Sequence, residues 1–300
     1  MKITDAIPPE ELRRWCQPDD WQGARLVAAN WAMIAAIFAG VALFTNPFSI
    51  VLGIVLLGGR QLGLAVLMHE CGHRTLFANR KANAWVGQWL CASPIMTNME
   101  RYAAGHIHHH RHAGSEQDPD LPNYRAYPIG RDSFRRKIVR DLTGRTGFRL
   151  LAGRFRNQDA LFGSQLGSSG TGGFVVVSLV MFAVLHAFGH GALYWMWPAA
   201  FLTSYLLFAR LRQIAEHGGV PDLFDPDPRR HTRTTIACWW ERLFVAPNFV
   251  NFHLEHHLAA AVPCYRLRDF HALLQQRHVY DHTSFPASYA AVLKSVTTAT

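Results

Sequence analysis

The chain has 300 residues, of which 49% are hydrophobic, 12% are aromatic and only 17% are charged. Average soluble domains carry about 25% charged residues, so this composition excludes a disordered chain and a coiled coil and favours a membrane protein. The mean hydropathy is only +0.01, so the apolar residues must be concentrated in blocks. The net charge of +9 comes without a basic-aromatic RNA-binding pattern or a DNA-binding motif. We therefore expect no nucleic-acid partner, and contact with anionic lipid or an acidic protein instead.

Four apolar segments are predicted to cross the membrane as two hairpins, over residues 26–45, 48–68, 172–188 and 192–209. Each is long enough, at 1.5 Å per helical residue, to cover most or all of a hydrocarbon core of about 30 Å. Acidic residues precede the first apolar block, which argues for an internal anchor rather than a cleavable signal peptide. We predict an all-α integral membrane protein that forms a single domain over residues 1–300.

The distribution of basic residues predicts the orientation of the chain. Fifteen of the 30 Lys and Arg residues lie between Arg74 and Gly170, and neither hairpin turn contains any. Because cytoplasmic loops are enriched in Lys and Arg, we expect the N-terminus and a helical cap of residues 69–170 and 210–300 on the cytoplasmic side of a cell membrane, the inner membrane if the source is bacterial. Residues 85–96 and 236–250 are predicted to be interfacial or re-entrant, and the GSSGTGG segment at 167–173 a flexible connection.

Histidine spacing carries the clearest functional signal, because more than half of the 17 histidines fall in three short clusters. His69 and His73 are four residues apart, so both rings project from one helical face. At about 100° per residue, the other two clusters each place three rings on one stripe. These are His106, His109 and His110, and His253, His256 and His257. His108 and His112 fall on the opposite face of their helix, and so does Glu255 on its own helix. The other eight clustered histidines are predicted to converge on metal.

Imidazole binds zinc, copper, nickel and iron, so spacing alone does not name the metal. One alternative is a membrane zinc protease, since His69 to His73 matches HExxH with Glu70 as the general base. A zinc site of that kind needs three protein ligands and a water, which leaves six clustered histidines unexplained. A metal transporter is a second alternative, but only His186 and His190 are candidates for mid-membrane ligands.

The segments HECGHRTLF, HIHHHRHAGSEQDPDL and HLEHHLAAAVPCYRL resemble, in order, the three histidine boxes of the membrane fatty acid desaturase and hydroxylase superfamily. The resemblance extends from about Gln61 to Leu274. It implies two iron ions, O2 as co-substrate and attack on an unactivated C–H bond of a lipid chain. The implied ligands are the eight box histidines, and His217 after the fourth span is a ninth candidate.

The resemblance implies a fatty acyl desaturase that introduces a C=C bond, and a lipid or carotenoid hydroxylase or ketolase shares the same boxes. Carboxylates that could orient the ligand rings are Glu70, Asp118, Asp120, Glu216 and Glu255. Each of them could instead cap a helix or pair with an arginine.

Electrons must come from a separate protein, ferredoxin-like or cytochrome b5-like, because the chain has no HPGG haem signature, no cysteine quartet and no GxGxxG fingerprint. A basic run suggests where an acidic donor docks, although a lipid-binding face explains it equally well. The run comprises Arg131, Arg135, Arg136, Lys137 and Arg140. Arg60 lies about 13 Å before His69 along a helix. It marks the membrane interface or lies inside the bundle facing the substrate cavity.

Overall fold

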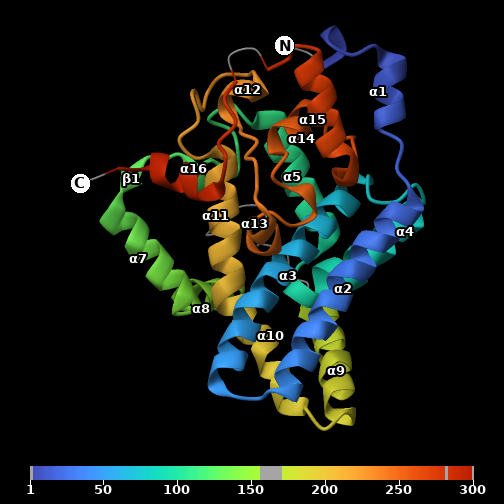
Figure 1. Ribbon diagram of the computed structural model, residues 1–300, viewed down its shortest axis with the longest axis vertical. Helices are drawn as coiled ribbons and strands as arrows, with labels where there is room; N and C mark the ends of the chain where they lie inside the picture. The colour runs from blue at the N-terminus through green and yellow to red at the C-terminus, as the bar shows by residue number, and fades with distance from the viewer. Residues whose placement is uncertain (1–2, 156–170, 281–282, 299–300) are drawn as a thin grey trace.

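The computed structural model describes residues 3–155, 171–280 and 283–298, and these form helices together with one short pair of strands. Two helical hairpins extend toward one end of the molecule, and the shorter helices of the cap gather at the other end (Figure 1). The first hairpin consists of α2 (Asp20–Leu43) and α3 (Pro47–His73). The second consists of α9 (Thr171–Ala187) and a continuous helical segment over residues 191–217.

The ends of the first hairpin are defined by local capping. The Asp19 carboxylate caps α2 by accepting hydrogen bonds from the amides of Trp21 and Gln22. Asn46 and Ser49 cap each other reciprocally at the start of α3, and Pro47 occupies the first helical position, where its missing N–H costs nothing. Both helices are longer than predicted, because α2 begins at Asp20, before its apolar block, and α3 continues past its apolar block to His73. The extension of α3 carries its last turn, with both histidines, into the cap.

The expectation of four spans is met in part. Three helices are long and apolar enough to cross a membrane, namely α2, α3 and residues 191–217, whereas the third expected span is the shorter apolar helix α9. The last segment comprises a 3-10 turn (Gly191–Trp195), α10 (Met196–Ala200), a π-helical turn (Phe201–Tyr205) and α11 (Leu206–His217). It runs beyond the predicted end at residue 209, and so brings His217 into the cap.

Small residues let α3 pack closely on the last span. A Cβ at Gly58 would lie 2.2 Å from the Ser204 hydroxyl, and one at Gly53 would lie 2.2 Å from Met196. The side chain of Gln61 donates to the carbonyl of Trp197 at 2.9 Å, which satisfies a polar group inside the bundle. This packing holds the ends of α3 and α11 next to each other.

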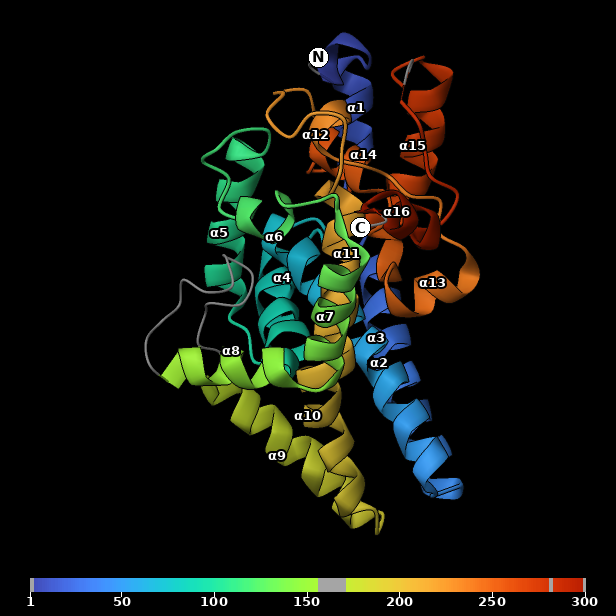
Figure 2. The same ribbon diagram turned by 90° about the vertical axis from the view of Figure 1, so that its left-hand side faces the viewer.

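Residues 80–155 form most of the cap on one side. After α4 (Arg80–Val86), a π-helical turn (Gly87–Ala92) and a 3-10 turn (Ser93–Ile95) replace the single segment predicted over 85–96. There follow α5 (Met99–His112), α6 (Leu121–Tyr124), α7 (Arg131–Leu142) and α8 (Arg145–Phe155). Figure 2 shows α8 lying across the end of α9, with α7 rising beside α11.

The C-terminal part closes the cap. The predicted interfacial helix over 236–250 is shorter, because only α13 (Trp239–Phe244) is α-helical and Asn248 has a left-handed φ of 52°. The remaining elements are η1 (Ile3–Asp5), α1 (Pro9–Trp15), α12 (Pro228–His231), a 3-10 turn (Pro247–Phe249), α14 (His253–Leu258), a 3-10 turn (Cys264–Arg266), α15 (Leu267–Gln276), α16 (Tyr289–Ser295), and the parallel strands β1 (Ile129–Gly130) and β2 (Thr297–Thr298).

Of the predicted flexible connection at 167–173, residues 167–170 lie outside the part of the chain that the structure describes. Its last three residues belong to α9 instead of a loop. A Cβ at Gly173 would lie 2.3 Å from the Ser93 hydroxyl, so glycine permits a close contact between α9 and the 3-10 turn at Ser93. The correction therefore has a packing reason.

Candidate metal centre

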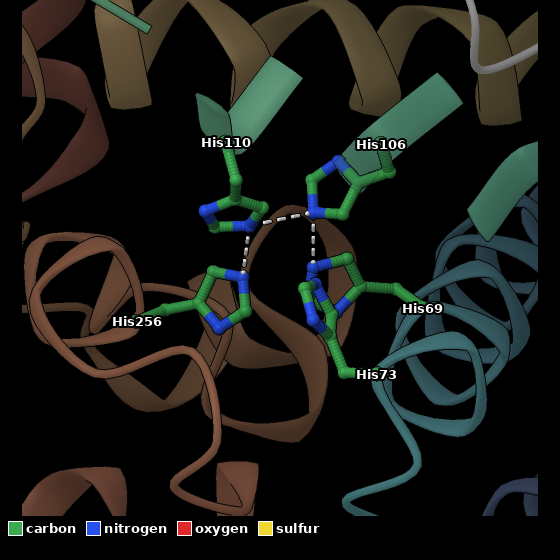
Figure 3. Close-up of side chains that lie close together, drawn as sticks. All are labelled: His69, His73, His106, His110 and His256. Atoms are coloured by element: carbon green, nitrogen blue, oxygen red, sulfur yellow. Dashed lines mark hydrogen bonds between the residues drawn. The ribbon is translucent and has the colours of Figure 1, made fainter. Parts of the chain in front are cut away.

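Nine histidines from four helices meet in the cap, and their ring nitrogens form two neighbouring groups. In the first group, five ring nitrogens lie within 4.8 Å of one another, and no carboxylate is among them. Its members are His69, His73, His106, His110 and His256 (Figure 3). The second group comprises His109, His217, His253 and His257 together with Glu216, in two overlapping sets that share His217.

Local structure explains why these helices approach so closely. The Asn98 side chain caps α5 by accepting from the amide of Arg101 at 3.0 Å. A Cβ at Gly72 would lie 3.1 Å from the Ala103 methyl group. The absence of a side chain at Gly72, next to His73 on α3, therefore allows α5 to pack closely against α3. On the other side, the amide at the start of α14, on Leu254, donates to the Thr234 hydroxyl at 3.1 Å.

In the first group the Nε2 atoms face one another. Nε2 of His106 lies 2.8 Å from that of His69 and 3.0 Å from that of His110, and the latter is 2.9 Å from Nε2 of His256. Among the described residues, Nε2 of His73 and Nδ1 of His106 are buried without a hydrogen-bond partner. Buried polar nitrogens are normally satisfied. Converging lone pairs and unpartnered nitrogens are what a metal-binding set of imidazoles presents.

The second group has the same character and adjoins the first. Nε2 of His253 lies 2.9 Å from Nε2 of His217 and 3.2 Å from Nε2 of His257. The ring of His109 lies 5.1 Å from that of His217. Because the rings of His110 and His257 are only 4.5 Å apart, the two groups could hold two metal ions side by side.

Electrostatics keep most of these rings neutral. Burial, and then repulsion from neighbouring imidazoles, lowers the pKa of His106, His256 and His257 well below the usual histidine value. The same causes lower the pKa of His110 and His253. His109 differs: burial opposes its protonation, but the hydrogen bond to Asp118 raises its pKa. Neutral imidazole is the form that binds metal.

Several rings are held from behind through Nδ1. Nδ1 of His69 lies 3.0 Å from Oε1 of Glu70, and Nδ1 of His109 lies 2.8 Å from Oδ1 of Asp118. Nδ1 of His217 donates to the backbone carbonyl of residue 231 at 3.1 Å. Such contacts orient a ring and direct its other nitrogen, Nε2, toward the interior of the site.

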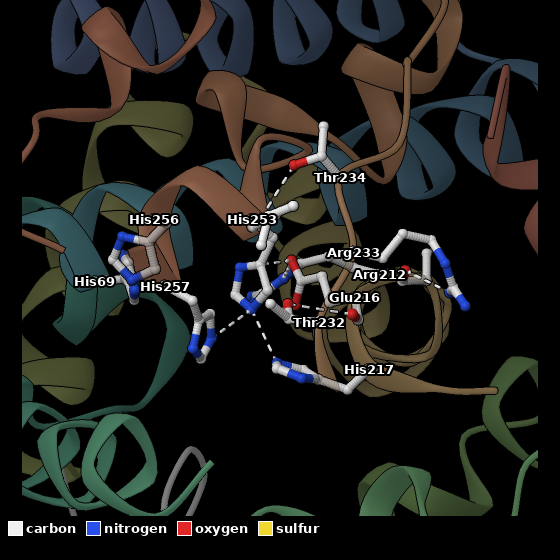
Figure 4. A network of polar contacts seen from close by, with 12 residues as sticks. His69, Arg212, Glu216, His217, Thr232, Arg233, Thr234, His253, His256 and His257 are labelled. Atoms are coloured by element: carbon white, nitrogen blue, oxygen red, sulfur yellow. Dashed lines mark hydrogen bonds and ion pairs between the residues drawn. The ribbon is translucent and has the colours of Figure 1, made fainter. Parts of the chain in front are cut away.

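The predicted carboxylates do not all contact the histidine groups. Glu216 pairs with Arg212 at 2.6 Å, and the same oxygen lies 3.6 Å from Nδ1 of His253 (Figure 4). Asp120 lies 3.9 Å from Nδ1 of His109. Glu255 instead accepts hydrogen bonds from His271, Tyr280 and Thr234. It therefore connects α14 to the C-terminal segment, on the face opposite the clustered histidines.

Glu70 is enclosed rather than available to a water molecule. Its side chain is buried, and Oε2 accepts hydrogen bonds from the Thr75 hydroxyl and the Cys264 amide, each at 2.9 Å. Oε1 faces Nδ1 of His69, whereas Nε2 of that histidine points the other way, toward His106. The HExxH letters are therefore present without the geometry of a general base above a zinc-bound water.

The histidines that were not predicted to bind the metal lie outside the two groups. His108 and His112 contact each other, with ring centroids 4.4 Å apart, on the outer side of α5. His186 stacks on Phe182, and His190 begins the 3-10 turn that follows α9. Neither pair belongs to the two groups.

Sequence reasoning missed several groups that support the site. The hydroxyl of Tyr124 donates to Asp118, and the carbonyl of His231 accepts from His217. Tyr124 carries a weak signal, because it follows Asp118 by six residues near the end of the second histidine box. A backbone carbonyl carries none, since every residue has one.

The basic run occupies one surface of α7. Arg131, Arg135 and Arg136 are exposed, Lys137 lies over the ring of Tyr127 at 5.3 Å, and Arg140 donates to Thr146 at 3.3 Å. Together with Arg145 and Arg149 of α8, four of the five line a hollow of about 670 Å³. The run is thus a compact cationic surface on the side of the cap.

The chain is similar to several known proteins. The family model described as fatty acid desaturase matches residues 45–286. The chain is 27% identical over 267 residues to dihydrorhizobitoxine desaturase of Bradyrhizobium elkanii, covering 84% of this chain and 74% of that protein. It is 26% identical over 249 residues to sn-1 oleoyl-lipid 12-desaturase of Synechocystis sp., covering 73% of this chain and 66% of that protein.

A shorter similarity is also present. Over 80 residues the chain is 35% identical to β-carotene ketolase of Paracoccus sp., which covers 25% of this chain and 32% of that protein. The family match, in contrast, spans most of the chain and includes all nine clustered histidines. The chain therefore belongs to the fatty acid desaturase family, and its activity is that of an oxidoreductase.

Proposed function

We propose that this protein is an O2-dependent, non-haem di-iron fatty acyl desaturase, which introduces a C=C bond into a lipid chain. The observation that carries the proposal is the pair of adjacent, largely buried histidine groups, in which the rings of His69 and His109 are held from behind through Nδ1. The family match supports the reaction class. The sn-1 oleoyl-lipid 12-desaturase is a relative whose name specifies a lipid substrate.

Two iron ions fit the residues present. The first group offers five imidazoles and no carboxylate to one ion, and the second offers four imidazoles, with Glu216 close by, to the other. Imidazole is a suitable ligand for iron. When bound, the iron ions would supply the activation of O2 and the abstraction of hydrogen from an unactivated C–H bond.

The residues of the chain would do the rest. Glu70 and Asp118 fix the direction of His69 and His109, so that these rings need not reorganise during turnover. The low pKa of His106 and His256 keeps both rings unprotonated at neutral pH. Burial of the histidines limits the access of water, which protects a strong oxidant from side reactions.

The electron balance requires a partner. Removing two hydrogens from the substrate releases two electrons, but reduction of O2 to two waters consumes four, together with four protons. A separate ferredoxin-like or cytochrome b5-like protein would supply the other two electrons. The exposed arginines of α7 support a docking surface for an acidic donor. The excess of basic residues in the cap supports a cytoplasmic location of this surface.

A lipid or carotenoid hydroxylase or ketolase is the second candidate. The similarity to β-carotene ketolase favours it, although that similarity covers a quarter of the chain. Desaturation and hydroxylation share the first hydrogen abstraction and differ afterwards, so one arrangement of ligands serves both. A metalloprotease is disfavoured, because Glu70 is buried and already holds three hydrogen-bonding partners.

Expression in a host that lacks such enzymes, followed by mass spectrometry of lipids and pigments, tests the proposal. A desaturase removes two hydrogens from an acyl chain, whereas a hydroxylase or ketolase adds oxygen. The His106→Ala variant serves as the inactive control. Products that contain added oxygen would contradict the desaturase and support the hydroxylase or ketolase. Cleaved peptides without any lipid product would refute both functions.

A further inference from the structure

Arg60 is a buried cation in the middle of α3. Its side chain is 5% exposed, and it donates to Oδ1 of Asn30 at 3.3 Å and to the carbonyl of Leu243. These acceptors are neutral, and among the residues that the structure describes, no carboxylate lies within ion-pair distance. Buried arginines are usually paired with an anion. The charge of Arg60 therefore lacks the counter-charge that burial normally demands.

One end of an apolar groove between α2 and α3 is formed by this side chain. The groove has a volume of about 460 Å³, within the range of small-molecule sites. It extends to the hairpin turn, where the lining residue Phe44 is 72% exposed. Its walls are almost entirely apolar, and they include Met33, Ile37, Gly40, Leu52 and Leu56.

The length of the groove matches the length of one acyl chain. Ser49 and Arg60 both line it, and eleven residues of helix separate them, about 16 Å at 1.5 Å per residue. That is about the length of the acyl chain of one lipid, because two leaflets share the 30 Å hydrocarbon core. One acyl chain would thus be long enough to extend from the guanidinium to the hairpin turn.

The polar end of the groove lies beside a helix that carries exposed tryptophans. Leu243 belongs to α13, whose Trp239 and Trp240 are 75% and 46% exposed. Exposed tryptophans are enriched at the membrane–water interface. The α13 backbone reaches Arg60 because Gly59 has no side chain: a Cβ there would lie 2.4 Å from the carbonyl of Leu243.

We propose that this groove is a binding site for an anionic lipid, whose phosphate or carboxylate pairs with Arg60 and whose acyl chain lies along α2 and α3. The site is separate from the reaction site, because none of the nine clustered histidines lines it. His69 is nine residues, about 13 Å, farther along α3. The bound lipid would supply the missing counter-charge and fill the space between the two helices.

Photocrosslinking of the full-length protein, reconstituted in phosphatidylcholine vesicles, tests this site without any need for turnover. Three probes carry the same diazirine-labelled acyl chain: phosphatidylglycerol, a free fatty acid and phosphatidylcholine. Peptide mapping should place the anionic probes on residues 33–43 of α2, with labelling about tenfold above that of phosphatidylcholine, as a charge-assisted contact provides. Comparing the two anionic probes tells whether phosphate or carboxylate is preferred.

Variants separate the charge from the groove. Arg60→Gln should abolish the preference for anionic probes, whereas Arg25→Gln, at an exposed position of α2 outside the groove, should not. Gly40→Leu should block labelling by all three probes, because a Cβ at Gly40 meets open space and the added side chain can fill the groove without a clash. Ala39→Leu, at an exposed neighbouring position outside the groove, is its control.

Equal labelling by anionic and neutral probes in the unmodified protein would overturn the charge assignment. Labelling that persists in Gly40→Leu would overturn the groove itself, even if Arg60→Gln fails to fold. Loss of iron or of desaturation would affect neither readout, so failure of this proposal and failure of the proposed enzymatic function are distinguishable.

Discussion

Nδ1 of His109 lies 2.8 Å from Oδ1 of Asp118, and both side chains are buried. The hydroxyl of Tyr124 donates to the other carboxylate oxygen. Asp118 is therefore held in place while it orients a histidine of the second group. Contacts of this kind typically change metal affinity or activity about 10- to 100-fold when they are removed.

Asp118→Asn should accordingly lower both iron occupancy and turnover, by about 10-fold or more, because the neutral amide holds the His109 ring less firmly. Iron content by mass spectrometry and product formation measure the two effects. Glu116→Gln, two residues away and exposed, is the matched control and should behave as the unmodified protein. Equal iron content in both variants, with full activity, would show that the contact has no role in the site.

Iron stoichiometry tests the two histidine groups directly. Purified protein should contain close to two irons per chain, one for each group of imidazoles. His106→Ala and His256→Ala should abolish activity, since each removes a nitrogen from the centre of the first group. His108→Ala should retain most of the activity, because its ring contacts His112 on the outer side of α5. Stoichiometric zinc without iron would contradict the assignment.

Glu70→Gln distinguishes an oxygenase from a protease. In a protease the loss of the general base would eliminate catalysis while metal stays bound. In the structure Glu70 only orients His69 and accepts hydrogen bonds from Thr75 and Cys264. Glutamine keeps part of that network, so we expect turnover reduced by about 10-fold but measurable. Complete loss of turnover with the full metal content would contradict the assignment of the protein as an oxygenase.

Electron delivery should depend on salt and on α7. Attraction between opposite charges weakens as ionic strength rises, so turnover at limiting donor should fall between low and physiological salt. Combined Arg135→Glu and Arg136→Glu should raise the apparent KM for the donor and leave that for the lipid nearly unchanged. Reversing Arg80 and Lys81, exposed residues of α4 on the opposite side of the view in Figure 1, changes the charge equally and is the control.

Two results would contradict the electron route. One is turnover that does not change with salt. The other is activity of the purified chain with a nicotinamide nucleotide alone, because this would show that no separate donor is needed. If the α7 and α4 variants behave alike, the donor responds to net charge and not to the cationic surface of α7.

Residue spacing alone identified the histidines that could act together, because the spacing of residues along a helix sets the face from which each ring projects. Spacing separates His106 and His109 from His108; in the structure the first two lie in the histidine groups, whereas His108 contacts His112 and Glu255 contacts His271. Apolar blocks likewise identified α2 and α3, since burial in lipid requires a continuous run of apolar residues.

The division of the nine histidines into two groups depends on the packing of separate helices and could not be read from spacing. Neighbours in sequence separate, since His109 joins the second group and His110 the first, and His256 parts from His257 in the same way. The contacts of Arg60 were equally unpredictable from the sequence, because its partners, Asn30 and Leu243, lie on other helices. Helical periodicity specifies directions around one axis, whereas the partners of a side chain depend on how separate helices pack, which is a property of the whole fold.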